Sequence, residues 1–561
     1  MSPLLRLPGE CFVDFECFEV ASPRYVWKND SAGSTVDLRD FAFCRPLNSG
    51  EDGFFTKKAR VFQAERYGGG GLAGNGGGAR CGLFAGIQIK GIGQTPVAGR
   101  DAEYWHSHGA ASLEEAVREA VWGEVCHLAL PHGSVRTLGI ILTGSDAPYD
   151  AREGPTRSRR ALIVREASLR PAHFMRAIRF KPHAHVQMLP DVERTRAAIQ
   201  VLPSVLEALT GKQVGNTYAL QESLGELAAR SAEQLAAAQA RRLMHGAFDA
   251  SNMCLDGAWV DFGTITAVSD YGRIIVSRHG QDYWNQQQPL LHAFSELAFY
   301  AGKFLRLPRG SVGELISAIR KDFLETLGRR TQWEFAKLLG ASDHQLQQVD
   351  PRLIDAFFRQ ALDLIRRGNA EPFKFSPTHV SEMPETMGRY NLGRCLQRLA
   401  ARHTAAGMVE ALIEEIDDIA LRRRLAESAW ALREACIQAE PEARRPQVRI
   451  HMMVEGLRAN IALNTLYRSN LDQTITRLVE QPEGVESGIS AIMSDARLIF
   501  GRNADDMEDS ALTGAGASLD AANSCPVLLR GLIDRCLETF RTSMISESLK
   551  KDARDYAEEF L

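Results

Sequence analysis

The sequence predicts a mixed α/β fold in which a β-rich region, a mixed region and a helical region follow one another. Short alternating apolar runs, such as "GIQIKGIG" and "VRTLGIILTG", are separated by glycine turns over residues 1–150. Helix and strand patterns alternate over 151–300, and almost every segment of 301–561 shows helical periodicity. We therefore expect three regions with these boundaries.

The first region contains one clear helix, "SLEEAVREAVWGEVCHLAL", which begins after Ser112. Ser112 is a suitable N-cap because Glu115 follows three residues later, as in a capping box. Five apolar side chains share one face of this helix: Leu113, Ala116, Val117, Ala120 and Val121. We expect that face to pack against the strands.

In the second region a helix, "LGELAARSAEQLAAAQARRLM", ends directly before "HGAFDASNMCLDGAWVDFG". Asp256 and Gly257 indicate a hairpin turn between two short strands there. In the third region, "MVEALIEEIDDIALRRRLAESAWALREACI" predicts one long amphipathic helix, whereas "EQPEGVESG" and "GAGASLDAANSCP" predict loops.

The composition is that of a globular protein, with 561 residues, 45% hydrophobic and 24% charged. A formal net charge of −4, from 66 basic and 70 acidic residues, argues against a general nucleic-acid or membrane-surface binder. The ten cysteines are dispersed without a CxxC pair, which favours reduced thiols. The amino terminus lacks a signal-peptide core, and no segment offers about 18 uncharged apolar residues. We expect a soluble cytoplasmic protein.

A glycine-rich loop precedes a strand that carries a lysine, and together they predict a phosphate site. The loop from Gly68 to Gly78 can adopt positive φ angles and bring backbone N–H groups close to a phosphate. Arg80 adds a permanent positive charge. Strand alternation in "GIQIK" places Gln88 and Lys90 on the cleft side, opposite the two isoleucines. The alternative is a flexible surface loop followed by an edge strand with a solvated lysine.

Three further residues complete a candidate nucleotide site. Glu119 lies beside the apolar face of the first-region helix, where a carboxylate can hold Lys90 and keep it protonated. Asn252 and Asp261 flank the expected hairpin and offer two oxygen ligands for Mg²⁺. The alternatives are that Glu119 is a solvated helix residue, that Asn252 forms an Asx turn and that Asp261 is an exposed acid at the end of a strand.

The order of these features is informative in itself. Loop, lysine, helix glutamate, "HG" asparagine and "DFG" follow one another as a kinase-like nucleotide site requires. The order predicts a two-lobe, protein-kinase-like fold with an α-helical carboxyl-terminal extension.

The motifs resemble those of the selenoprotein O family, kinase-like proteins that transfer AMP from ATP to protein hydroxyl groups. The resemblance spans about Phe41 to Phe299. The matching stretches are "GGGARCG", "IKGIGQTP", "EEAVREAVWGEV", "VREASLR", "HGAFDASNM", "VDFG" and "HGQDYWNQQQP".

The resemblance implies a ligand set for ATP and for Mg²⁺ or Mn²⁺. It implies that Glu119 anchors Lys90 and that Asn252 and Asp261 hold the metal. The residues implied to line the nucleotide, besides Asp261, are Gly77, Gly78, Arg80, Lys90, His108, Gly109, Arg165 and Arg170, of which the three arginines and the lysine contact phosphates. The nucleotide would lie reversed relative to ordinary kinases. A Ser, Thr or Tyr hydroxyl of a protein or peptide would then attack the α-phosphate.

The sequence departs from the family at the proton acceptor. The family has an aspartate before the metal-binding asparagine, and this chain has Ser251 there. Asp249, two residues earlier, can accept the proton if the loop is slightly rearranged. Loss of a general base typically costs about 10²–10⁴ in rate. We therefore take Asp249, Ser251 and Glu119 as catalytic candidates.

The nucleotide loops depart as well. The glycine and arginine loop lacks the family's acidic residue, and His108 stands where the family has an aspartate before Gly109. These changes leave three hypotheses: an ATP-dependent AMP transferase, a catalytically impaired pseudoenzyme whose nucleotide site regulates a surface of the helical region, or a peptide-maturation factor. Retention of Lys90, Glu119, Asn252 and Asp261 favours chemistry, because a regulatory pocket has less need of a complete metal set.

Overall fold

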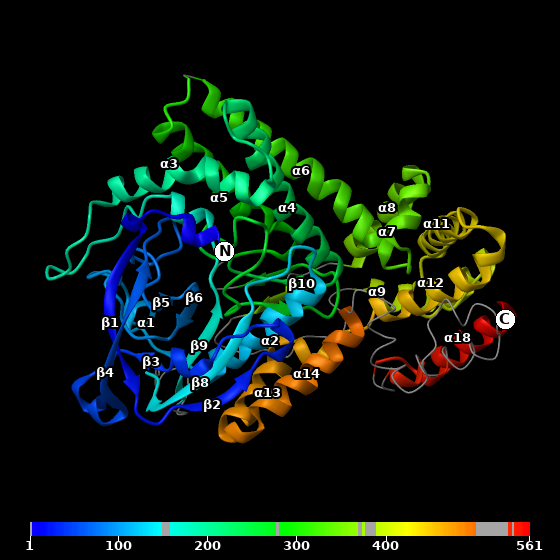
Figure 1. The fold of residues 1–561 in the computed structure, drawn as a ribbon. Helices are drawn as coiled ribbons and strands as arrows, with labels where there is room; N and C mark the ends of the chain where they lie inside the picture. The colour runs from blue at the N-terminus through cyan, green and yellow to red at the C-terminus, as the bar shows by residue number, and fades with distance from the viewer. Residues whose placement is uncertain are drawn as a thin grey trace.

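The computed structural model describes residues 3–148, 158–276, 280–308, 310–368, 373–375, 389–500, 534, 537–540 and 544–560. Within them a large antiparallel sheet lies at one end of the molecule, and helices make up most of the rest (Figure 1). The expected mixed α/β class is confirmed.

The large sheet has nine strands in the order β2-β8-β9-β6-β5-β4-β1-β3, with β7 paired to the start of β9. All neighbouring strands are antiparallel. The strands are β1 (Phe12–Val20), β2 (Arg24–Lys28), β3 (Phe43–Cys44), β4 (Phe55–Glu65), β5 (Cys81–Phe84), β6 (Ile87–Lys90), β7 (Ala111–Ser112), β8 (Thr137–Asp146) and β9 (Arg159–Glu166). Because β9 joins β8 to β6, the sheet continues well past residue 150.

Strand β6 is short but lies in the interior of the sheet. Lys90, its last residue, pairs with Cys81 of β5 on one side and with Ile163 of β9 on the other. Neighbours on both sides fix the backbone of this lysine, so its side chain starts from a rigid point. The alternative of an edge strand is thereby excluded.

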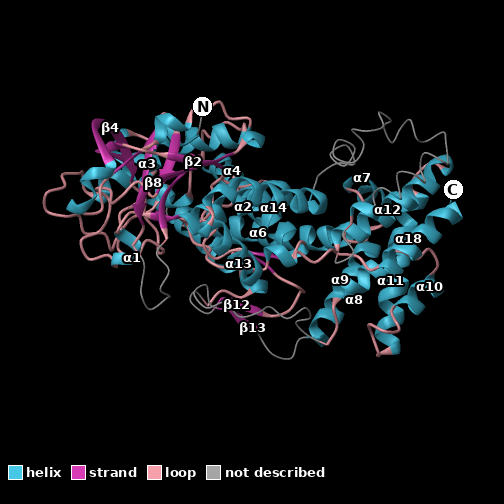
Figure 2. Cartoon of the chain, turned by 90° about the horizontal axis from the view of Figure 1, so that it is seen from below, coloured by secondary structure: helices cyan, strands magenta, loops and turns pink. Residues whose placement is uncertain are grey.

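Helix α1 (Tyr104–Ser107) is one turn, and α2 (Leu113–Ala129) is the helix expected in the first region. Ser112 caps α2, since its Oγ accepts from the backbone N of Glu115 at 3.1 Å. All five apolar residues of the expected face are buried. The helix packs against β8 and β9 and also against α14, so it has protein on two sides (Figure 2).

Helices dominate the chain after the sheet. They are α3 (Asp191–Thr210), α4 (Thr217–Ala240), α5 (Gln287–Phe304), α6 (Ser311–Lys337), α7 (Asp343–Gln348), α8 (Pro351–Gly368), α9 (Leu392–Ala400), α10 (Ala405–Ala411), α11 (Ile419–Gln438), α12 (Arg445–Ala459), α13 (Arg468–Glu480), α14 (Val485–Phe500) and α18 (Glu547–Phe560). Two short pairs accompany them: antiparallel β10 (Leu243–Met244) and β11 (Thr266–Ala267), and parallel β12 (Ile274–Val276) and β13 (Phe373–Phe375).

Three local expectations need correction. The turn at Asp256 is present, but single bridge residues, Met253 and Trp259, flank it instead of two strands. The long amphipathic run is divided into α10 and α11, because Asp418 accepts from the backbone N of Leu421 and starts a new helix. "EQPEGVESG" is a short 3₁₀ turn, Pro482–Gly484, that leads directly into α14. "GAGASLDAANSCP" lies outside the described residues.

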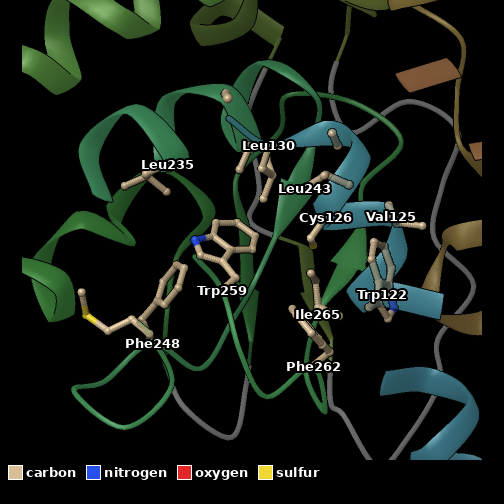
Figure 3. Packing of buried hydrophobic residues seen from close by; sticks show 14 of the residues in the cluster. Trp122, Val125, Cys126, Leu130, Leu235, Leu243, Phe248, Trp259, Phe262 and Ile265 are labelled. Carbon is tan, nitrogen blue, oxygen red and sulfur yellow. The ribbon is translucent and has the colours of Figure 1, made fainter. Parts of the chain in front are cut away.

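The largest core cluster draws residues from all three expected regions, from Leu4 through Leu235 to Phe500. Figure 3 shows Phe262 and Ile265, which follow the aspartate of "VDFG", beside Cys126 of α2. Apolar packing therefore ties α2 directly to the segment that carries Asp261.

The eight cysteines among the described residues are buried and free. Cys525 and Cys536 lie outside the part of the chain that the structure describes. Within that part, no helix combines the length and the apolar character needed to cross a bilayer.

Candidate active site

The centre of the site is an ion pair between Lys90 of β6 and Glu119 of α2. Lys90 Nζ and Glu119 Oε1 lie 2.8 Å apart, and each side chain is 2% exposed. Lys90 Nζ also lies 3.4 Å from Asp261 Oδ1. Burial opposes the charged form of the lysine, but Asp261, Glu115 and Glu119 outweigh it and raise its pKa above the ordinary value. Lys90 is therefore a fixed positive charge.

A second carboxylate of α2, Glu115, has a role that the motifs did not indicate. Glu115 Oε1 lies 2.8 Å from Lys90 Nζ, and the two Glu115 oxygens accept from the Arg80 guanidinium at 2.9 and 2.7 Å. Burial would raise the pKa of Glu115, but Arg80 and Lys90 lower it to about 2. Glu115 lies four residues before Glu119 and so on the same face of the helix, and this spacing is the sequence signal for its place in the site.

Arg165 of β9 lies behind the Lys90–Glu119 pair. Its Nη1 donates to Glu119 Oε2 at 2.8 Å, and its Nε donates to Gln88 Oε1 at 2.7 Å. Its Nη2 lies 3.9 Å from the Sγ of Cys81, and the side chain is 3% exposed. Each guanidinium nitrogen thus has a protein partner, and in this arrangement Arg165 orients Glu119. A phosphate contact by Arg165 requires these bonds to change.

Asp261 begins the "DFG" segment beside Lys90. Its φ of 67° is uncommon for a residue other than glycine. The next backbone N–H, that of Phe262, donates to Glu119 Oε1 at 3.3 Å. Burial would raise the pKa of Asp261, but Lys90 and Arg80 lower it well below the ordinary value. The site therefore holds an ionised carboxylate at its open side, where the Asp261 side chain is 34% exposed.

The loop from His245 to Asn252 is tied to the same segment. The Nε2 of His245 lies 3.1 Å from the carbonyl oxygen of Val260, directly before Asp261. Asn252 Nδ2 donates to the carbonyl of Ala247 at 2.9 Å, which closes the loop. These bonds hold the two expected metal ligands on connected pieces of backbone.

Arg170 also acts on this loop. Its Nη1 donates to the carbonyl of Ser251 at 2.5 Å, and its guanidinium lies 5.5 Å from the centre of the Tyr67 ring. The structure therefore shows Arg170 as a support for the loop backbone. Its expected phosphate contact stays a prediction.

Asp249 and Ser251, the two candidate proton acceptors, are hydrogen-bonded to each other. Asp249 Oδ1 accepts from both the backbone N and the Oγ of Ser251 at 2.6 Å. Burial raises the pKa of Asp249 above its ordinary value. The Ser251 hydroxyl thus already donates a hydrogen bond to Asp249, a carboxylate whose pKa is raised.

The tip of the glycine-rich loop covers Asp249. A Cβ added to Gly71 would lie 1.7 Å from Asp249 Oδ2, and one added to Gly69 would lie 3.4 Å from the Cβ of Ala250. A side chain at Gly71 cannot be accommodated unless the loop or the carboxylate moves. The loop therefore contacts the proton-accepting side of the site.

The base of the glycine loop packs on β4. Gly77 has a φ of 146°, and a Cβ there would lie 2.0 Å from the carbonyl oxygen of Glu65. The backbone N of Gly78 donates to this same carbonyl at 2.9 Å. In this structure the N–H of Gly78 is used within the protein, whereas a phosphate cradle was expected.

His108 and Gly109 lie near Arg80. Burial, followed by the charge of Arg80, lowers the pKa of His108 to about 4, so the ring is neutral at neutral pH. Its Nδ1 accepts from the backbone N of Ala110 at 3.0 Å. The carbonyl of Gly109 accepts from the N of Gly93 at 2.9 Å, which brings two loops into contact.

The oxygen donors at the site suit a hard divalent cation. Asp261 supplies an ionised carboxylate and Asn252 an amide oxygen, and Mg²⁺ favours such ligands. Across the described ranges, no group of three or more His, Cys, Asp or Glu side chains is arranged to hold a metal ion. A cation at these two residues would complete its shell with phosphate oxygens and water, which is usual for Mg²⁺.

Part of this chain, including the residues of the site, is similar to known proteins. Residues 70–301 match the family described as "Protein adenylyltransferase SelO". The chain is similar to "Protein nucleotidyltransferase YdiU" of Bordetella petrii, with 27% identity over 307 residues, which are 50% of this chain and 57% of that protein. Proteins of the same name from Chromohalobacter salexigens and Variovorax paradoxus are 28% identical over 196 residues and 29% identical over 207 residues.

The matched spans are limited. They cover 34% and 36% of this chain in the second and third comparisons, and 35% and 38% of those two relatives. The chain therefore matches less than two thirds of the length of each of these relatives. All of the candidate site residues from Gly77 to Asp261 fall within residues 70–301, whereas α13 and α14 lie beyond them.

Glu119→Gln is expected to destabilise the fold. The amide has one accepting oxygen in place of two, so Lys90 and Arg165 are left with buried charge that is incompletely compensated. Breaking a buried ion pair costs about 3–5 kcal/mol. Urea unfolding followed by circular dichroism measures the change. The exposed Glu222 of α4 gives a matched control, Glu222→Gln, expected to stay within about 0.5 kcal/mol of the parent. Equal midpoints for the two variants would contradict the central role of Glu119.

Gly71→Ala is expected to lower the free energy of unfolding by about 1–3 kcal/mol, as overpacking does. The neighbouring Gly70 provides the control, because a Cβ there meets nothing within 4 Å. Gly70→Ala should be neutral or slightly stabilising. Thermal unfolding of both variants measures the difference, and an equally harmless Gly71→Ala would show that the loop does not rest on Asp249.

Proposed function

We propose that this chain, whose residues 70–301 belong to the SelO family, transfers AMP from ATP to a hydroxyl group of a protein or peptide. The observation that carries the proposal is the buried Lys90–Glu119 pair, with Arg80 and Asp261 next to it. A lysine held protonated in this way is suited to a nucleotide phosphate. The names of the relatives, which describe nucleotidyl transfer, support the same class of reaction.

The proposal includes a kinase-like arrangement of two lobes. The antiparallel sheet with α2 would form the nucleotide-binding lobe, and the loop from His245 to Asn252 with Asp261 would belong to the second lobe. The helices after about residue 300 would then be an extension of that unit.

The charges of the site favour a polyanionic ligand. Arg80, Lys90, Arg165 and Arg170 lie among the carboxylates of Glu115, Glu119, Asp249 and Asp261. The phosphates of a nucleotide would be drawn to these four cations. Glu115 holds Arg80 and Lys90 in place, and phosphate oxygens would compete with it for both cations.

In the proposed step, the acceptor hydroxyl oxygen attacks the α-phosphorus of ATP. The new oxygen–phosphorus bond forms as the bond from the α-phosphorus to the pyrophosphate oxygen breaks, and pyrophosphate leaves. Ser251 takes the hydroxyl proton as it gives its own to Asp249, to which it is already hydrogen-bonded. A bound Mg²⁺ or Mn²⁺, held by Asn252 and Asp261, would supply neutralisation of phosphate charge.

The transferred group can be identified with labelled ATP. The protein is incubated with Mg²⁺, a panel of peptides that contain Ser, Thr or Tyr, and ATP labelled at the α- or the γ-phosphate. We expect label from the α-position and little from the γ-position. Lys90→Ala and Asp261→Ala should abolish it, because each removes a charge next to the phosphates. Lys321→Ala, at an exposed position of α6, is the control.

Two outcomes would redirect the proposal. Incorporation of the γ-label alone would indicate ordinary phosphoryl transfer. Nucleotide binding by calorimetry without any label transfer would favour the pseudoenzyme hypothesis.

The proton acceptor can be tested through pH. If Asp249 accepts the proton, the transfer rate falls as pH drops through its pKa, because the protonated carboxyl no longer accepts, and burial raises that pKa above its ordinary value. Asp249→Asn should remove this acid limb and lower the rate by about 10²–10⁴, with ATP affinity nearly unchanged. An unaltered pH profile in Asp249→Asn would discard the role.

A further inference from the structure

A segment of the carboxyl-terminal helical region contacts the back of the site. Arg468, the first residue of α13, donates from Nη1 to the carbonyl of Gly263 at 2.9 Å. Gly263 is the last residue of the "DFG" segment and lies two residues after Asp261. The Arg468 side chain is 10% exposed, so this contact is largely shielded from water.

The same end of α13 is joined to α2. Asp472 lies 3.6 Å from the Nε of Arg468, and its Oδ1 accepts from Arg118 at 2.6 Å. Arg118 directly precedes Glu119 on α2, and the Arg118 and Asp472 side chains are 13% and 18% exposed. One carboxylate thus links the helix that carries Glu119 to the arginine that holds Gly263.

The backbone around Arg468 is anchored to the second loop of the site. Its N–H donates to Thr266 Oγ1 at 3.1 Å, and Tyr467 forms a parallel bridge with Ala267. Thr266 and Ala267 form β11, which pairs with β10 directly before His245. The start of α13 therefore contacts the segment that follows Asp261, and this segment pairs in turn with β10, which leads into the loop that carries Asn252.

Glu119 makes the matching connection from inside the site. Its Oε1 accepts from the N of Phe262, while Arg468 holds the carbonyl of Gly263 from outside. The segment that follows Asp261 is thus held on both sides. Asp261, with its positive φ angle, directly precedes the two restrained residues.

We propose that Arg468 and Asp472 are positioning residues, which hold α2 and the segment 261–263 in the register where Glu119 and Asp261 both face Lys90. The proposal rests on the proposed function for its effect on rate. It concerns residues outside the match to the family model, because both lie after residue 301. Neither residue contacts the reacting groups, so their effect passes through Gly263 and Arg118.

The test compares Arg468→Ala with Arg468→Lys, Asp472→Asn and a matched control. The control is Arg24→Ala, because Arg24 of β2 also makes an ion pair with the carboxyl-terminal region, 2.7 Å from Glu483, but at an exposed site. Two readouts are used on the full chain: amide hydrogen exchange over α2 and residues 260–264, and the kcat and KM of AMP transfer.

We expect Arg468→Ala to speed exchange in both segments and to lower kcat about 10- to 100-fold, as small misplacements of catalytic groups do, with a smaller change in KM for ATP. Asp472→Asn should act in the same direction, and Arg468→Lys should recover part of the loss. Arg24→Ala should leave both readouts unchanged.

Each contrary result has a separate meaning. Exchange and kcat in Arg468→Ala equal to those of Arg24→Ala would overturn the positioning role. If Arg468→Ala fails to fold, Asp472→Asn, which keeps the side-chain size, carries the same comparison. If the parent protein transfers no AMP, the proposed function fails, and hydrogen exchange alone still decides whether α13 holds the two segments.

Discussion

A buried lysine stays charged only where nearby carboxylates compensate for its loss of hydration. At this site Glu119 gives part of that compensation, and the rest of the site depends on the Lys90–Glu119 pair. Lys90 is fixed by an interior strand, so Glu119 must approach it, and α2 is thereby held against the sheet. The second oxygen of Glu119 binds Arg165 of β9, and its first also accepts from Phe262. One carboxylate thus sets the relative positions of β6, β9, α2 and the "DFG" segment.

Helix α2 carries paired charges on two of its sides. Toward the sheet, Glu115 and Glu119 neutralise Arg80, Lys90 and Arg165. On its other side the helix carries Arg118, whose charge is met by Asp472 of α13. The helix is therefore paired on two sides, and its contacts with Arg80, Lys90 and Arg165 and with the carboxyl-terminal region are parts of one electrostatic arrangement.

Local periodicity was sufficient to find the centre of the site. Alternation in "GIQIK" placed Lys90 with Gln88, and the apolar face of the first helix placed Glu119 beside the strands. Local patterns could not show which partners each cation takes. Arg165 and Arg170 have protein partners, and the N–H of Gly78 is directed at a neighbouring strand.

Contacts between distant segments that no motif marks were outside the reach of the sequence. Gly263 and Arg468 are 205 residues apart, and nothing in the residues near either one predicts the bond. The same holds for Gly71 and Asp249, which lie so close that a Cβ on Gly71 would collide with the Asp249 carboxylate. Such pairs are decided by how helices and loops pack, which period-two and period-3.6 patterns do not encode.

Helix α14 covers α2, although α14 lies outside the residues that match the family model. The match to the family model ends at residue 301, yet α2 shares its core with helices that follow residue 445. A fragment cut at that border would expose contiguous apolar surface to water, and such surface promotes aggregation. The residues that match the family model are therefore fewer than the residues needed to cover the apolar face of α2.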